Sequence, residues 1–156
     1  MLKSFPPIVG PKPRVLILGT MPSVKSLEKH EYYGHPQNAF WKIMTLLYGD
    51  VRNYSAKKRL LKRNHIALWD VVGTCRRPGS SDSNISDACF NDVKGLLKRR
   101  TSVKKILLNG GKAAELYLKH AGSDFSVPYE VLPSTSPANT KNFADKLRAW
   151  RKALEG

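Results

Sequence analysis

The sequence predicts an α/β domain in which helices cover both faces of a mostly parallel sheet of four strands. Short apolar runs bounded by turn residues alternate along the chain with amphipathic segments of helical period. Strands that alternate with helices form parallel sheets, because each parallel return of the chain needs a long crossover. The 156 residues, 41% hydrophobic and 25% charged, have ordinary globular composition and are predicted to form one domain, 1–156.

Four segments have the character of strands. Residues 14–19 and 104–109 are continuous apolar runs, typical of strands that are buried on both faces. Residues 65–73 and 129–132 are the other two candidates. The loops that follow these strands begin at Thr20, Asp70, Asn109 and Pro133. Right-handed crossovers bring the carboxyl ends of parallel strands to one edge, where ligands bind in open α/β sheets. We therefore expect the four loops to meet.

Five segments have helical character, and they cover residues 40–47, 56–64, 90–100, 112–120 and 143–154. Ser55 is a candidate cap for the second helix, and Asp92 lies in the first turn of the third. In the last helix, Phe143, Leu147, Trp150 and Leu154 form the predicted buried stripe. Its basic residues, Lys146 among them, are expected on the solvated face.

Residues 32–41 are dense in aromatic and amide or imidazole groups and lead directly into the first amphipathic helix. Pro36 disfavours helix immediately before it, so residues 33–38 are predicted to form a shaped loop at a helix N-terminus. Asn38 either caps this helix or presents its amide to a ligand. Tyr33 is either a core ring or a flat surface for a ligand, and the residues alone leave both alternatives open.

The charge of the chain is strongly positive. Lys and Arg number 27 against 12 Asp and Glu, giving a net charge of +15 and a pI near 10.0. Such a domain usually binds a polyanion, because neutralised phosphates release counterions. Nucleic acid is the expected partner, although a basic surface can also serve solubility.

Metal and membrane classes are disfavoured. Cys75 and Cys89 are too few for a four-cysteine zinc or iron–sulfur site, and the four histidines lack metal-ligand spacing, so no metal is predicted. No apolar run reaches the length of about 18 residues that spanning a bilayer requires. The N-terminus lacks the apolar core of a signal peptide. A cytoplasmic protein that avoids membranes is expected.

Three loops are candidates for phosphate contacts. Residues 76–84 are basic and Ser-rich, and Arg76 and Arg77 either contact phosphates or belong to a plain surface linker. Gly110-Gly111 could cradle a phosphate, although close packing of strand and helix explains it better. Residues 133–139 combine two prolines with three hydroxyl groups.

Four motifs, in chain order, resemble those of the uracil-DNA glycosylase superfamily. They are residues 16–23 (LILGTMPS), 32–41 (YYGHPQNAFW), 67–72 (ALWDVV) and 132–139 (LPSTSPAN). The set is most similar to the hypoxanthine-DNA glycosylase branch, and HPxNxFW is also similar to the mismatch-specific uracil-DNA glycosylases. Each motif is weak alone, but the ordered set is specific and spans the chain from the first strand to the last helix.

The resemblance implies a three-layer α/β/α sandwich and a monofunctional enzyme of base-excision repair. Such an enzyme removes a deaminated base, hypoxanthine first and also uracil or xanthine, from damaged DNA without a cofactor, and we expect it to act as a monomer. Two positions depart from the better-known branches: Met21 stands where they carry an Asp or Asn, and Leu132 where they carry a His or Asn. Both departures agree with the hypoxanthine branch, which is thought to place its key amide at the position of Asn38.

The resemblance also implies roles for named residues. Asn38 would orient water or bond the base edge, and Asp70 would stabilise a positively charged sugar or contact the base, unless it only caps its own loop. The base-binding candidates are Tyr33, Thr20, Met21, Asn109 and His35. The DNA-binding candidates are Ser23, Pro133, Ser134, Thr135, Ser136, Asn139, Arg76 and Arg77.

Two other classes compete with a glycosylase. The first is a non-catalytic nucleic-acid-binding protein on the same scaffold, which the apolar Met21 would suit. The second is a nucleotide- or phosphate-binding enzyme that uses Gly110-Gly111. Steep salt dependence of binding would favour DNA over a mononucleotide.

Overall fold

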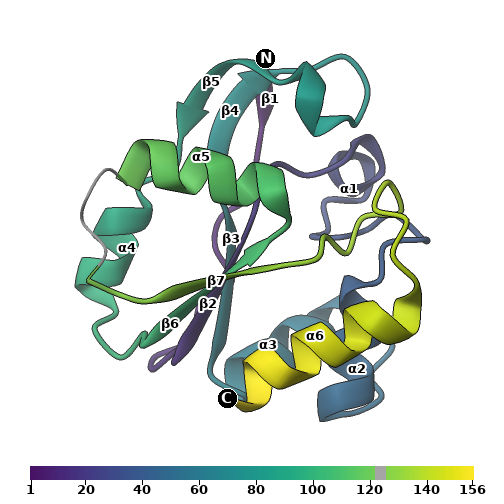
Figure 1. The fold of residues 1–156 in the computed structure, drawn as a ribbon, viewed down its shortest axis with the longest axis vertical. Coiled ribbons are helices and arrows are strands. Elements are labelled where there is room, and N and C mark those ends of the chain that lie inside the picture. Colours follow the sequence, from purple (N-terminus) through teal and green to yellow (C-terminus); the bar gives the residue numbers. More distant parts are fainter. Residues whose placement is uncertain (122–125) are drawn as a thin grey trace.

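The computed structural model describes residues 1–121 and 126–156 (Figure 1). The main sheet consists of β2 (Val15–Gly19), β3 (Ile66–Asp70), β6 (Lys105–Asn109) and β7 (Tyr129–Leu132). Its strand order is β3-β2-β6-β7, and every neighbouring pair is parallel. The four predicted strands and their parallel arrangement are confirmed.

Helices cover both faces of this sheet (Figure 1). One layer contains α2 (Phe40–Tyr48), α3 (Tyr54–Arg63) and α6 (Phe143–Glu155), and the other contains α4 (Val93–Arg99) and α5 (Gly111–Ala121). Successive side chains of a strand point to opposite faces of the sheet, so the core is divided between the two helical layers. Ile17 packs in the cluster with α2, α3 and α6, whereas Leu16 and Leu18 pack in the cluster with α4 and α5. The predicted three-layer α/β/α sandwich is confirmed.

A second, smaller sheet was not predicted. It joins β1 (Leu2–Lys3), β4 (Val72–Arg76) and β5 (Ser86–Phe90) in the antiparallel order β1-β4-β5. The apolar run taken as one strand over 65–73 divides at Val71, and its second half enters this sheet. A 3-10 turn, η1 (Asp82–Asn84), lies between β4 and β5.

Several helix boundaries differ from the prediction because other side chains cap the helices. Asp92 caps α4 by accepting from Gly95 N at 2.9 Å, so Phe90 belongs to β5 and not to the helix. Asn53, not Ser55, caps α3. The short α1 (Val24–Lys29), capped by Ser23, was not predicted because it has no extended apolar stripe. No helix in the described ranges is long and apolar enough to cross a membrane.

Candidate active site

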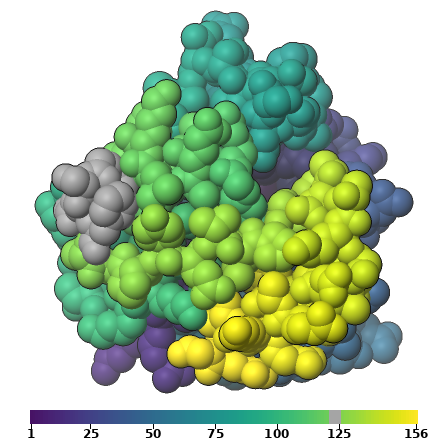
Figure 2. Space-filling model, in the orientation of Figure 1, coloured from purple at the N-terminus to yellow at the C-terminus, as the bar shows by residue number. Residues whose placement is uncertain are grey.

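The strand ends of the main sheet bring four polar positions to one edge. Gly19 ends β2, Asp70 ends β3 and Asn109 ends β6, while Thr135 lies just after β7. The register pairs Gly19 with Asp70 and Asn109 with Leu132. In Figure 2 the purple surface of the first part of the chain is set back between the teal atoms above it and the yellow-green atoms below it. The predicted meeting of the strand-end loops is confirmed.

Asn109 connects the loops at this edge. Its Oδ1 accepts from Thr135 N at 2.9 Å, and its Nδ2 donates both to Thr135 Oγ1 at 3.0 Å and to the Tyr33 phenol oxygen at 3.0 Å. Both Asn109 and Thr135 are buried. The side chain of Asn109 is therefore fully engaged in joining the loop after β7 to the loop that carries Tyr33.

Gly19 forms the floor between Tyr33 and Asp70. A β-carbon at Gly19 would lie 2.5 Å from Asp70 Oδ1 and 2.7 Å from the Tyr33 phenol oxygen. Only a residue without a side chain permits this approach. The glycine thus lets a phenol and a carboxylate converge on one point of the sheet edge.

Tyr33 is held in an unusual conformation. Its φ of 54° lies in the left-handed region, which non-glycine residues seldom adopt and which often marks functional sites. Its ring stacks on Phe40, with centroids 4.2 Å apart and planes at 27°. The following residue, Gly34, is fixed on both sides: its nitrogen donates to Ser26 Oγ at 2.9 Å, and its carbonyl accepts from Lys29 Nζ at 2.7 Å. Tyr33 as a whole residue keeps partial exposure.

Asp70 is a buried carboxyl group in a polar cluster. Burial, and secondly the charge of Asp82, raise its pKa to about 7, although the nearby Arg77 guanidinium acts in the opposite direction. Its Oδ2 is buried without a hydrogen-bond partner in the part of the chain that the structure describes. A buried oxygen without a partner is costly and is found where function requires it. Near neutral pH both protonation states of Asp70 are populated.

Tyr33 responds to the same surroundings. Burial first, and then the charge of Asp70, raise the pKa of the Tyr33 phenol well above its usual value. The phenol therefore keeps its proton and, while its oxygen accepts from Asn109, can donate to a ligand.

Arg77 does not face outward as predicted. It is buried, its Nη2 donates to Pro22 O at 2.7 Å and its Nε donates to Gly79 O at 2.7 Å. Its guanidinium thus fixes the loop after β2 to the loop after β4, and the contact of Arg77 with DNA stays a prediction. Thr20 also contributes, because its hydroxyl group hydrogen-bonds Asp82, which partly offsets the rise that burial causes in the pKa of Asp82.

Asn38 is partly exposed, and its side chain acts at the start of α2. Its Oδ1 accepts from Phe40 N at 2.9 Å, although the residue in the capping position is Ala39. Within the described chain no protein atom accepts from its Nδ2 group. Ala39 N donates to Thr135 O at 3.0 Å, which joins this helix start to the loop after β7. One end of the amide thus serves the helix, and the other end is left for a ligand.

The loop over residues 133–139 is stiffened by its own side chains. Ser134 Oγ accepts from Ser136 N, Ser136 Oγ from Ala138 N, and Asn139 Oδ1 from Lys141 N. Thr135 is 1% exposed, and its contact with DNA stays a prediction. The contacts of Pro133, Ser134, Ser136 and Asn139 with DNA stay predictions.

Comparison with known proteins identifies the family of the chain. The family model described as the uracil DNA glycosylase superfamily matches residues 6–155. The chain belongs to the uracil DNA glycosylase superfamily. A hypoxanthine DNA glycosylase of Methanosarcina barkeri is 34% identical over 158 residues, which cover 98% of each chain. Another, from Methanosarcina acetivorans, is 36% identical over 151 residues, 95% of this chain and 94% of the relative.

A solved structure supports the same assignment. The solution NMR structure of a candidate uracil DNA glycosylase from Methanosarcina acetivorans superposes with a TM-score of 0.79 at 37% identity. The match covers 99% of this chain and 98% of the other. The resemblance stated from the four motifs is confirmed, and the substrate of a member of this superfamily is DNA.

The remaining candidate residues have other contacts in the structure. Met21 is buried in the cluster that contains Val71 and Val72, and its contact with a base stays a prediction. Arg76 forms an exposed ion pair with Asp87 at 3.3 Å. His35 Nδ1 accepts from Gln37 N within a turn, and Ser23 caps α1.

Sequence reasoning missed three residues of this superfamily member's site. Gly19 could have been identified from its place at the end of a strand that faces Asp70. Asp82 was hidden in a segment that was taken as basic and Ser-rich. Lys146 was placed on the solvated face, yet it is 5% exposed. Lys146 lies three residues after Phe143 and four before Trp150, so the helical period places it on the apolar face. This spacing could have identified it as a buried residue.

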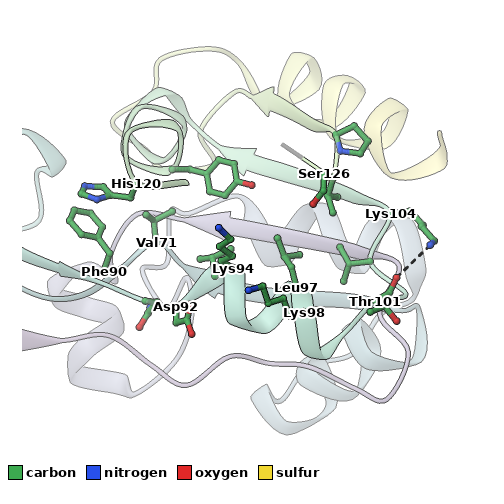
Figure 3. Close-up of a pocket in the computed structure, with 16 residues that line it drawn as sticks. Val71, Phe90, Asp92, Lys94, Leu97, Lys98, Thr101, Lys104, His120 and Ser126 are labelled. Carbon is green, nitrogen blue, oxygen red and sulfur yellow. Dashed lines mark hydrogen bonds between the residues drawn. The ribbon is translucent and has the colours of Figure 1, made fainter. Parts of the chain in front are cut away.

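A cavity of about 720 Å³ lies away from the glycosylase edge. Figure 3 shows it beside α4, with Lys94, Leu97 and Lys98, and with Phe90 and His120 stacked at one end. Val71, from the motif over residues 67–72, lines it, but none of the candidate catalytic, base-binding or DNA-binding residues does. In the described ranges, no three His, Cys, Asp or Glu side chains are grouped to hold a metal ion.

Proposed function

We propose that this chain is a monofunctional DNA glycosylase that hydrolyses the N-glycosidic bond of a deaminated base, with hypoxanthine as its main substrate and uracil or xanthine as weaker ones. The names and identities of the two Methanosarcina relatives support the choice of hypoxanthine. The observation that carries the proposal is the convergence of Tyr33 and Asp70 on Gly19, with Asn109 bonded to the Tyr33 phenol oxygen. We propose further that the enzyme acts as a monomer in the cytoplasm.

The reaction requires the damaged nucleotide to leave the stack. Extrusion costs a few kcal/mol, and less for a mispaired base. The ring of Tyr33, fixed by Phe40 on one side and by Asn109 at its hydroxyl, provides a rigid surface for the extruded base. Stacking is tolerant of base identity, because every base has a π-face.

Asn38 is proposed to act on the leaving base or on water through its Nδ2 group. Its Oδ1 is engaged by Phe40 N, so the group that remains can only donate. A donor stabilises negative charge that develops on a purine as its glycosidic bond breaks, and a fixed donor needs no reorganisation at that moment. Alternatively it orients the attacking water toward C1′.

Asp70 is proposed to serve through either protonation state. Ionised, it stabilises the positive charge of the oxocarbenium-like sugar, and protonated, it donates to the base. Its pKa of about 7 makes both forms available. A rate–pH profile separates the roles: activity rises with pH through 7 in the first case and falls in the second.

The test is a panel of matched duplexes that carry hypoxanthine, uracil, xanthine or adenine at one position. After incubation, alkali cleaves the strand wherever a base has been removed. We expect scission with hypoxanthine first, weaker scission with uracil or xanthine, and none with adenine. Binding without scission of any duplex would instead support the non-catalytic nucleic-acid-binding protein, which the same panel detects by gel shift.

A further inference from the structure

Lys146 is a buried cation on the apolar side of α6. It is 5% exposed, although the other basic residues near it in the helix, Arg148 and Lys152, are exposed. Lys and Arg are almost never fully buried unless their charges are satisfied. The burial of Lys146 therefore requires an explanation that a solvated helix face does not give.

The ammonium group of Lys146 binds the loop after β7. Its Nζ donates to Ser136 O at 3.1 Å and to Asn139 O at 3.1 Å. One turn later on the same helix, Trp150 Nε1 donates to Pro133 O at 3.0 Å. Two side chains of α6 thus hold three carbonyl groups of residues 133–139, so the loop is fixed to α6 along its length.

The charge of Lys146 is not neutralised by a carboxylate within the described chain. Its partners are the two carbonyl oxygens, and burial lowers the pKa of its ammonium group. A buried cation that is paired only with carbonyl dipoles is costly. Such a cation is tolerated where its hydrogen bonds fix a backbone conformation or where its positive charge attracts a ligand. A loop that binds a phosphate backbone would use both the fixed conformation and the positive charge.

The same loop is also joined to the candidate active site. Thr135 bonds Asn109 through its nitrogen and hydroxyl group, and its carbonyl accepts from Ala39 N. Residues 133–136 are therefore anchored to the base-binding edge on one side and to α6 on the other. Among the contacts that the structure describes, residues 136–139 are held from outside the loop by Lys146 and, within the turn that follows, by Lys141 N, which donates to Asn139 Oδ1.

We propose that Lys146 is a positioning residue whose ammonium group holds residues 136–139 in the shape that wedges a duplex open and keeps the damaged nucleotide extruded. The inference rests on the proposed glycosylase activity. Extrusion from a paired stack costs a few kcal/mol, and a stiff wedge that fills the space left in the stack would offset part of that cost. The role of Lys146 is therefore specific to substrates in which the base must first be extruded.

The experiment compares single-turnover excision of hypoxanthine from two duplexes of one sequence. In the first duplex the hypoxanthine is paired and stacked, and in the second it lies in an unpaired bubble. Lys146→Met removes the charge and both donors but keeps the length of the side chain. Lys152→Met is the matched control, because it makes the same change at an exposed position of the same helix.

We expect Lys146→Met to lower the rate on the paired duplex roughly 10-fold or more and the rate on the bubble by less than about 3-fold, because only the first substrate needs the wedge. Lys146→Arg, which keeps a charge and several donors, should recover most of the lost rate. Lys152→Met should match the wild type on both substrates. If Lys146→Met does not fold, Lys146→Gln, which keeps a donor for one carbonyl, is measured in its place.

Two results would overturn the proposal. Equal losses on the paired and bubble duplexes would mean that Lys146 only stabilises the fold, and an unchanged rate on both would mean that the loop does not need it. A wild-type protein that excises hypoxanthine from neither duplex would instead show that the proposed function itself is wrong, and this inference would fail with it.

Discussion

Asn109 and Thr135 form a mutual pair of hydrogen bonds, with Thr135 N donating to Asn109 Oδ1 at 2.9 Å and Asn109 Nδ2 donating to Thr135 Oγ1 at 3.0 Å. This pair fixes the loop after β7 to the end of β6. Because Nδ2 also donates to the Tyr33 phenol oxygen, the same amide fixes the position of the proposed stacking ring relative to the sheet edge.

Replacing Asn109 with Ala should therefore disturb both stability and excision. The buried Thr135 nitrogen would lose its acceptor, and a buried unsatisfied group costs about 1–3 kcal/mol. We expect a loss of that size in the free energy of unfolding, measured by urea denaturation, together with a loss of excision rate that exceeds the loss for Tyr33→Phe, because both Tyr33 and the loop after β7 lose their bonds to Asn109. Asn64→Ala is the control, since Asn64 donates to Leu60 O at the end of α3. An Asn109 variant that loses stability but keeps the wild-type rate would contradict the positioning role.

Asn38 offers a test in which one variant preserves the helix contact. Asn38→Asp keeps an oxygen for Phe40 N, whereas Asn38→Ala removes it and should lower stability by about 1 kcal/mol. Both variants lack the Nδ2 donor, so both should lose excision while their affinity for DNA, measured by fluorescence anisotropy, changes little. Full activity of the Asp variant would assign the function to the oxygen and not to the donor.

Tyr33 can be divided into its ring and its hydroxyl group. Tyr33→Phe keeps the stacking surface and loses one hydrogen bond from Asn109, so excision should fall only several-fold, in line with a net bond energy of about 1 kcal/mol. Tyr33→Ala removes the ring, and stacking of a base on an aromatic side chain is worth about 1–3 kcal/mol, so the rate should fall roughly 10- to 100-fold. Far-UV circular dichroism should be unchanged in both. Equal losses would indicate that the hydroxyl group carries the effect.

The sheet and its two helical layers could be predicted because they depend on local patterns. Leu16, Ile17 and Leu18 pack alternately into the two cores. A continuous apolar run predicts such a strand, because both of its faces are buried. The small antiparallel sheet could not be predicted in this way. Its pairing of Leu2 with Cys75 joins residues far apart in the chain, and neither short segment has a distinctive pattern.

The site was predictable where a residue lies at a strand end and not where its side chain depends on tertiary packing. Asn109 was correctly placed at the edge, but its bonds to Tyr33 and Thr135 require the assembled fold. Arg77 shows the reverse. A basic, Ser-rich segment suggests a solvated loop, yet the carbonyl groups of Pro22 and Gly79 draw this guanidinium into the interior.

Asp70 should make the stability of the protein depend on pH. Its pKa is raised from 3.8 to about 7 in the folded state, mainly by burial, so between these values the folded protein holds a proton that the unfolded chain releases. Stability that is present below pH 4 is then lost as the pH rises through 7. At 1.36 kcal/mol for each pKa unit, the contribution is on the order of 4 kcal/mol. Asp70→Asn should remove this loss and so be more stable than the wild type at pH 8, despite being impaired in excision.

The comparison is made by urea denaturation of both proteins between pH 4 and 8. The difference in unfolding free energy, variant minus wild type, should rise across that interval and level off above pH 8. Asp87→Asn is the control, because Asp87 is exposed, pairs with Arg76, and has a left-handed φ of 49° that Asn also adopts readily. It gives the reference for removing one surface carboxylate. A wild-type profile that Asp70→Asn leaves unchanged would mean that this carboxyl group has the same pKa in the folded and the unfolded protein. It would then be ionised near neutral pH, and the dual role proposed for it would reduce to stabilisation of the sugar cation.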